Sequence, residues 1–281
     1  MRIGNTTFDT KSHTYIMGIL NVTPDSFSDG GKWNDRDKAL KHVEEMINEG
    51  AAIIDVGGES TRPGYTLITE EEEISRIRPV IKSIKENFDI PVSIDTYKSG
   101  VAAEAIKTGA DLINDIWGLQ YDANIAGVIA DNNACCCCMH NRKDKSQYGK
   151  HSRDKRGELY DNFLQDYFAD LANIVHLAKE AGIQDDKIIL DPGIGFAKSY
   201  ENNLEAVNTL EQLHQFGYPI LLGTSRKSFL GLALDLPVNE RVEGTVATTV
   251  MGVMKGCSFV RVHDIKENYR AIKMTEAILG R

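Results

Sequence analysis

The sequence predicts an α/β fold, a single (β/α)₈ (TIM) barrel domain over residues 1–281 with a short hairpin-like segment at its N-terminus. Apolar runs of strand length alternate eight times with segments whose apolar residues recur at helical spacing. The runs are apolar throughout, as expected of parallel strands that are buried on both faces. No Gly-x-Gly-x-x-Gly follows the first run, so an open dinucleotide-binding sheet is disfavoured.

The elements are expected in a regular order along the chain. A turn at Gly4-Asn5 forms the N-terminal hairpin, and the first strand spans residues 15–20. The first helix begins near Asp35 and stops at Gly50. The other seven strands are expected at residues 52–58, 91–95, 111–116, 134–140, 187–191, 219–222 and 259–262. A long amphipathic helix is expected over 158–180, and a later one from the stripe Val242, Val246, Val250 and Val253.

The composition limits the classes of function. With 42% hydrophobic and 26% charged residues the chain has the composition of a soluble globular protein. The net charge of -9 disfavours a nucleic-acid partner. The first residues do not resemble a signal peptide, and no apolar run approaches the roughly 20 residues that span a bilayer. We therefore expect a cytoplasmic protein with no membrane partner.

The five cysteines do not form a metal motif. Cys135 to Cys138 are consecutive and Cys257 is remote. Neighbouring residues in a strand point to opposite faces, so four adjacent thiols cannot converge on one metal ion. We interpret them as small buried strand residues, with a reactive thiol as the alternative.

Polar side chains follow each expected strand. They are Asn21, 59–64, Asp95, Asn114 with Asp115, His140, Asp191, 225–228, and Arg261 with His263. In a barrel the functional groups lie at the carboxyl ends of the strands, so these residues are expected at one mouth. The set offers carboxylate and amide acceptors together with cations, and it pairs no serine or cysteine with an obvious base, which disfavours acyl transfer. A cap at the strand end is the alternative role of Asp95 and, more so, of Asp115.

The stretch Asp191-Pro192-Gly193-Ile194-Gly195-Phe196 is the expected centre of the site. The β-branched run Ile188-Ile189-Leu190 ends in residues that cannot continue a central strand, so a carboxylate is delivered where the chain turns. Arg261 and His263 alternate along the last strand, which places both cations on one face.

The motifs at these strand ends resemble those of the dihydropteroate synthase family, folate-pathway enzymes that join a pterin to p-aminobenzoate. The matching segments are residues 17–31, 58–64, 93–96, 113–115, 191–196, 225–228 and 261–264. The match runs from residue 15 to the C-terminus. It departs after Met139-His140, where the family often continues with Met-Gln-Gly and this chain has Asn141-Arg142-Lys143. The basic stretch 141–157 is interpreted mainly as a solvated loop.

The resemblance implies a role for each candidate residue. The pterin would contact Asp95, Asn114, Met139, Asp191 and Lys227. The diphosphate would contact Asn21, Thr61, Arg62, Arg261 and His263. The p-aminobenzoate would contact Phe27, Pro63, Phe196, Lys227 and Ser228. Asp95, Lys227, Arg261 and His263 would be the catalytic residues, and Asn21 would bind Mg²⁺. The family also implies a homodimer.

The implied reaction is a substitution at the pterin methylene of 7,8-dihydropterin-6-ylmethyl diphosphate. Diphosphate leaves and the arylamine attacks, which requires no dedicated general base. Two alternatives are a pterin-dependent methyltransferase domain and a non-catalytic pterin-binding paralogue. The segments 225–228 and 261–263, which would serve a diphosphate and an arylamine, count against the methyltransferase, and the presence of Arg62, Lys227, Arg261 and His263 counts against the paralogue.

Overall fold

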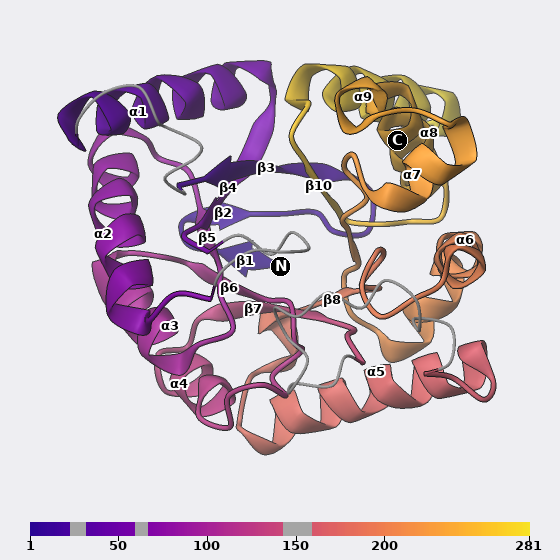
Figure 1. Cartoon of the computed structure of the whole chain (residues 1–281), viewed down its shortest axis with the longest axis horizontal. Coiled ribbons are helices and arrows are strands. Elements are labelled where there is room, and N and C mark those ends of the chain that lie inside the picture. Colours follow the sequence, from indigo (N-terminus) through magenta and orange to yellow (C-terminus); the bar gives the residue numbers. More distant parts are fainter. Residues whose placement is uncertain (23–31, 60–66, 143–158) are drawn as a thin grey trace.

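The computed structural model describes residues 1–22, 32–59, 67–142 and 159–281, and in it eight parallel strands form a ring enclosed by helices (Figure 1). The strands are β3 Tyr15–Asn21, β4 Ala51–Gly57, β5 Val92–Asp95, β6 Leu112–Asp115, β7 Cys135–Met139, β8 Ile188–Asp191, β9 Leu221–Leu222 and β10 Phe259–Val262. They pair in the order β8-β7-β6-β5-β4-β3-β10-β9. A parallel bridge between Leu190 and Ile220 brings β8 beside β9, so the barrel is nearly closed. The predicted (β/α)₈ barrel is confirmed.

Helices cover the outer face of this ring. They are α1 Lys32–Glu49, α2 Glu70–Asn87, α3 Ser99–Thr108, α4 Ile125–Asp131, α5 Phe163–Glu180, α6 Tyr200–Asn208, α7 Ser228–Leu234, α8 Val242–Met254 and α9 Ile265–Leu279, with 3₁₀ turns at Asp185–Lys187, Leu210–Phe216 and Val238–Glu240. The helix expected over 158–180 begins at Phe163, after Asn162 caps it by accepting a hydrogen bond from the backbone N–H of Gln165. Within the described ranges no helix is long and apolar enough to cross a membrane.

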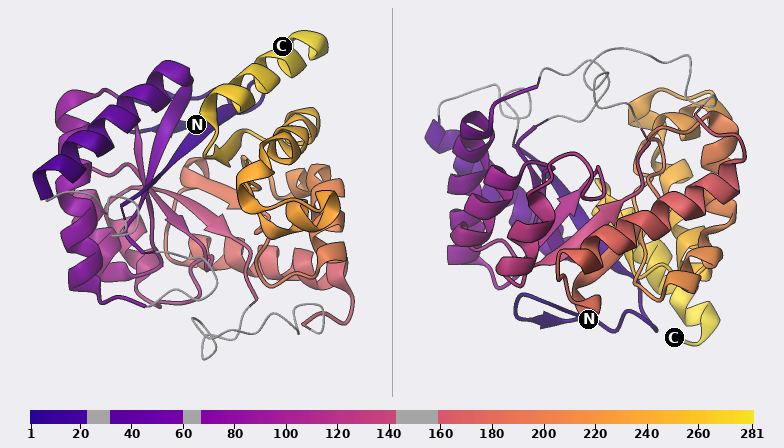
Figure 2. Two further views of the ribbon diagram at one scale, coloured as in Figure 1. Left: turned by 45° about the horizontal axis from the view of Figure 1, so that its top comes forward. Right: turned by 90° about the horizontal axis from the view of Figure 1, so that it is seen from below.

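Side chains alternate between the barrel interior and the helical layer. The interior cluster contains Met17, Ile53, Leu112, Cys135, Cys137, Ile189, Leu221 and Phe259. Ile3 and Phe8, on and just after the hairpin of β1 Arg2–Ile3 and β2 Thr6–Thr7, join this cluster, so the hairpin closes the amino-terminal end of the barrel (Figure 2, right). Apolar side chains therefore fill the amino-terminal half of the barrel interior. The carboxyl end is left for polar side chains, as is usual in this fold.

The four consecutive cysteines follow this alternation. Cys135 and Cys137 face the interior, whereas Cys136 and Cys138 pack in the layer between strands and helices. All four are buried and free of disulfides. Burial raises the pKa of Cys137 well above its usual value, which disfavours the thiolate. The interpretation as inert strand residues is therefore supported over a reactive thiol.

Helix α8 is present where the valine stripe predicts it, but its buried face differs. The buried residues are Gly244, Thr245, Thr248, Thr249, Gly252 and Val253, while the other three valines of the stripe are only half-buried. A Cβ on Gly252 would come within 2.8 Å of Leu222, so glycine allows the helix to approach β9 closely. Thr248 Oγ1 lies 2.7 Å from Thr224 Oγ1, which satisfies the buried hydroxyls. Apolarity alone therefore indicates the wrong face.

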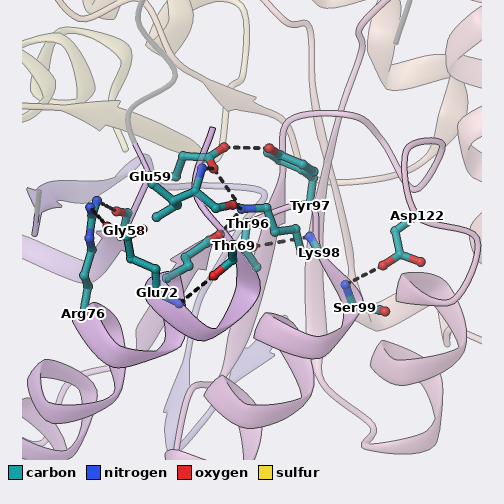
Figure 3. A network of polar contacts seen from close by, with 12 residues as sticks. Gly58, Glu59, Thr69, Glu72, Arg76, Thr96, Tyr97, Lys98, Ser99 and Asp122 are labelled. Carbon is teal, nitrogen blue, oxygen red and sulfur yellow. Dashed lines mark hydrogen bonds and ion pairs between the residues drawn. The ribbon is translucent and has the colours of Figure 1, made fainter. Parts of the chain in front are cut away.

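A half-buried lysine joins the ends of two neighbouring strands. Lys98, which follows β5, donates from Nζ to Glu59 Oε2 at 2.8 Å, to Glu73 Oε2 of α2 at 2.7 Å and to the Ile68 carbonyl at 2.9 Å. Tyr97 donates its hydroxyl to Glu59 Oε1 at 2.6 Å (Figure 3). Burial raises the pKa of Glu73, and the hydrogen bond from Lys98 opposes that rise. One ammonium thus supports two buried carboxyl groups.

Lys98→Met is expected to lower the free energy of unfolding by about 3 kcal/mol, because it removes the only ion-pair partner described here for two nearly buried carboxylates. Urea denaturation of the variant measures the change. Lys82→Met is the matched control, since Lys82 of α2 pairs with Glu86 in solvent. Equal midpoints for the two variants would show that the Lys98 network contributes nothing to stability.

Candidate functional site

Polar side chains gather inside the carboxyl end of the barrel because the strands are in register there. Asn21 pairs with Gly57, Gly57 with Asp95, and Asp95 with Asn114. These four residues form one row across β3 to β6, and side chains in one such row share a face. Asn21 is half-buried, whereas Asp95 and Asn114 are buried. The expectation that these residues converge is confirmed.

Asp55 of β4 is a central site residue that the sequence reasoning missed. Asp55 is fully buried. It precedes Gly57 by two residues on β4, so it lies on the same face of the strand and farther from the carboxyl end. Arg261 donates from Nε to Asp55 Oδ2 at 2.6 Å and from Nη2 to Asp95 Oδ2 at 2.7 Å. Ser93 and Asn114 also donate to Asp55, at 2.5 and 3.3 Å. A charged residue inside an otherwise apolar strand was the available signal, since charges are rarely fully buried without partners.

The charge of this cluster is not balanced, because one guanidinium faces two carboxyl groups. Burial raises the pKa of Asp95 to about 7; Arg261 opposes this rise and the negative charge of Asp55 adds to it. Burial alone would lower the pKa of Arg261, but Asp55 and Asp95 outweigh it and hold the pKa above its usual value. This end of the barrel therefore holds one guanidinium against two carboxyl groups.

The Asp191 turn, residues 191–196, is shaped by two close approaches. Gly193 has a φ of +67°, and a Cβ there would overlap the carbonyl oxygen of His140, so only glycine fits. The backbone N–H of Gly193 donates to Asp191 Oδ1 at 2.7 Å. The backbone N–H of Gly195 donates to Asn203 Oδ1 at 2.6 Å. Burial raises the pKa of Asp191, and Lys227 opposes that rise.

Three predicted residues meet around Gly223, which follows β9. A Cβ built on Gly223 would lie 3.6 Å from Asp191 Oδ2, 3.8 Å from Lys227 Nζ and 4.0 Å from Arg261 Cβ. Lys227 also donates to the carbonyl of Ile194, and burial lowers its pKa to about 8. Side chains from β8, β10 and the start of α7 therefore converge where this strand end carries no side chain.

An apolar patch borders this polar cluster. Tyr97, Ile116, Trp117 and Met139 form a buried group, and the half-buried Phe196 packs against it. Lys227 Nζ lies 4.8 Å from the centre of the Phe196 ring, so this ring connects the patch to the cations. Met139 and Phe196 are thus brought together as expected.

His263 lies at the end of β10, on the same side as Arg261. Its Nδ1 lies 2.9 Å from Ser225 Oγ, and its backbone N–H donates to the same hydroxyl at 3.1 Å. Ser225 therefore fixes the ring, which leaves the orientation of Nε2 defined. Ser228 is the exposed first residue of α7.

Other expectations at the strand ends have different outcomes. Asp115 caps the turn after β6 by accepting from the N–H groups of Trp117 at 2.8 Å and Leu119 at 2.7 Å, as its structural alternative predicts. His140 is fully buried beside α5 rather than in the mouth of the barrel. Four predicted site residues, Phe27, Thr61, Arg62 and Pro63, and most of the basic stretch 141–157 lie outside the described residues.

Asn21 fits the expected magnesium ligand by its chemistry. An amide oxygen at the mouth suits a hard cation, and Mg²⁺ commonly uses one or two protein oxygens together with water and substrate phosphates. Among the described residues no three His, Cys, Asp or Glu side chains gather as a metal site.

The chain matches proteins of known family over its whole length. The model of the family described as "Pterin binding enzyme" matches residues 17–263. Dihydropteroate synthase of Clostridium beijerinckii is 61% identical over 100% of both chains, and that of Bacillus subtilis is 52% identical over 96% of this chain and 90% of its own.

Solved structures give the same result. A dihydropteroate synthase from Clostridium difficile, crystallised in the presence of pteroic acid, has a TM-score of 0.89 and 47% identity over 98% of this chain and 100% of its own. The Yersinia pestis enzyme in a sulfonamide complex has a TM-score of 0.89 and 40% identity over 100% of this chain and 99% of its own. This chain therefore belongs to the dihydropteroate synthase family of pterin-binding enzymes, which are transferases.

Proposed function

We propose that this chain catalyses a Mg²⁺-dependent substitution at the methylene of 7,8-dihydropterin-6-ylmethyl diphosphate, with p-aminobenzoate as nucleophile, to give 7,8-dihydropteroate and diphosphate. The observation that carries the proposal is the convergence of Asp191, Lys227 and Arg261 around Gly223. The Clostridium difficile and Yersinia pestis structures, with pteroic acid and a sulfonamide, support the same substrate classes.

The pterin is recognised through its polar edge. Its amino-pyrimidinone presents two adjacent N–H donors, which a carboxylate accepts as a fork. In Asp191, Oδ1 is oriented by the Gly193 N–H, and Oδ2 faces the space beside Gly223. Asn114 both donates and accepts, and Lys227 donates to a ring acceptor. Asp95 and Met139 border the ring near the reacting methylene.

The leaving diphosphate is stabilised by the cations of β10. His263 is oriented by Ser225 beside Arg261, and Arg261 uses two of its five N–H groups in the hydrogen bonds described to Asp55 and Asp95. Asn21 is the protein ligand for Mg²⁺, which neutralises charge on the leaving diphosphate when bound. Thr61 and Arg62 remain predictions for the same group.

The p-aminobenzoate is held at the apolar side of the site. Phe196 offers an aromatic face beside Lys227. Ser228, at the exposed start of α7, binds the carboxylate of p-aminobenzoate. An arylamine is a free nucleophile at neutral pH, and its proton becomes acidic once the new bond forms. The catalytic residues therefore orient the substrates and stabilise the charge that develops, and none of them is a dedicated base. These residues are Asp95, Lys227, Arg261 and His263. Phe27 and Pro63 remain predictions for this subsite.

The proposal includes a homodimer in the cytoplasm. Most of the large apolar side chains that are exposed in the described ranges belong to the α7 to α9 region, including Leu232, Met254 and Ile278. These helices occupy one sector of the molecule (Figure 1), and a patch of this kind fits a second copy. Five buried free cysteines agree with a reducing compartment.

Coupled assays test the reaction. Incubation with dihydropterin diphosphate, labelled p-aminobenzoate and Mg²⁺ is expected to release diphosphate together with labelled dihydropteroate, and chelation of Mg²⁺ by EDTA is expected to stop both. Binding of the pterin without release of diphosphate would contradict the proposed reaction and favour a non-catalytic paralogue.

Separate substitutions test the binding sites proposed for the pterin ring and for its diphosphate. Asp191→Ala is expected to weaken binding of a pterin with or without diphosphate by about 100-fold, because the ring loses its charged acceptor. His263→Ala is expected to weaken only the diphosphate form. Calorimetry with both ligands measures the difference. Equal losses for the two ligands in His263→Ala would contradict the assignment of His263 to the diphosphate.

A further inference from the structure

Lys198 is a fully buried lysine directly behind the Asp191 turn. It follows Phe196 by two residues and is 1% exposed. Its Nζ donates to Nδ1 of His140 at 2.8 Å, to the Gly193 carbonyl at 3.0 Å and to the Phe196 carbonyl at 3.3 Å. An ammonium group has three N–H donors, so each of them has an acceptor here. Only the charged form supplies all three hydrogen bonds.

His140 is fixed as the acceptor for this lysine. Burial lowers the pKa of His140 to about 3, so its ring is neutral. Its Nε2 lies 3.2 Å from Asp170 Oδ2, and a carboxylate oxygen accepts, so the ring proton is assigned to Nε2 and Nδ1 is left to accept from Lys198. Asp170 also lies 2.8 Å from Nε of Arg142. The contacts therefore form a continuous polar chain from the Asp191 turn to α5.

The same contacts control the orientation of Asp191. Lys198 holds the carbonyl of Gly193, while the N–H of that residue donates to Asp191 Oδ1 at 2.7 Å. The N–H of His140 donates to the Asp191 carbonyl at 2.9 Å. Burial lowers the pKa of Lys198 to about 7, and the charge of Asp191 opposes that change. Lys198 and Asp191 are thus linked in two ways: both hydrogen-bond to the backbone of Gly193, and their opposite charges attract each other.

A purely structural explanation of Lys198 is disfavoured by its cost. Burying an ammonium is expensive, and apolar residues of similar volume are commonly neutral or stabilising at such positions. We propose that Lys198 is a positioning residue for pterin binding, which holds the Gly193 and Phe196 carbonyls so that the Asp191 carboxylate faces the pocket. This inference rests on the proposed role of Asp191.

Lys198→Met tests the inference because methionine keeps most of the volume and removes the charge. We expect the affinity for dihydropterin diphosphate, measured by calorimetry, to fall by about 30-fold, and the KM for p-aminobenzoate to change much less, since Lys198 contacts that subsite only through the Phe196 carbonyl. Lys255→Met is the matched control, since Lys255 also donates to a backbone carbonyl, that of Asn208 at 2.7 Å, but far along the chain from the turn. If Lys198→Met does not fold, Lys198→Gln is measured in the same way.

A double-mutant cycle with Asp191→Asn separates positioning from general damage. If Lys198 acts through the carboxylate, Lys198→Met costs less than about threefold in affinity when Asp191 is already asparagine. Additive losses, or a loss in KM for both substrates alike, would overturn the inference. If Asp191→Asn weakens binding and Lys198→Met does not, only the inference fails. If Asp191→Asn leaves binding unchanged, the proposed role of Asp191 fails as well.

Discussion

The division of one guanidinium between two buried carboxyl groups organises the site. Arg261 crosses the barrel from β10 to reach Asp55 of β4 and Asp95 of β5. A pair of this kind is stable only if its remaining hydrogen-bonding groups are satisfied, and Ser93 and Asn114 do this for Asp55. Asn114 and Asp95 are thereby oriented before any substrate arrives, which is the preorganisation that electrostatic catalysis requires.

Two other lysines support the edges of this centre in the same way. Lys98 joins Glu59, at the end of β4, to α2, and Lys198 joins the Asp191 turn to His140. Both ammonium groups, that of Lys198 buried and that of Lys98 half-buried, hydrogen-bond to backbone carbonyls as well as to side chains. Removing each ammonium group from water costs free energy. In return, each holds the backbone near the site in one conformation, Lys98 through the Ile68 carbonyl and Lys198 through the Gly193 carbonyl. The geometry of the site is therefore fixed by charges, while the apolar side chains lie between the strands and the helices and at the other end of the barrel.

The sequence predicts the fold and much of the site because barrel strands are uniformly apolar and their carboxyl ends are polar. Asp95, Asn114, Asp191 and Arg261 could be found in this way. Asp55 could not, because strand-end reasoning looks at the residues around and beyond each strand's last residue, and Asp55 lies two residues before the end of β4, within the apolar run. The roles of Lys198 and of His140 were equally hidden, since their partners lie on other elements. The buried face of α8 was missed because threonine and glycine bury without apolar character.

A single titration tests the central claim most directly. The pKa of Asp95 can be followed by carbon-13 NMR of labelled aspartate, in the native chain and in Asp55→Asn. If Asp55 shares Arg261 with Asp95, then removing its charge removes repulsion and leaves the guanidinium to Asp95 alone, so that the pKa falls below its value of about 7. A pKa of Asp95 that stays unchanged or rises in Asp55→Asn would contradict this account.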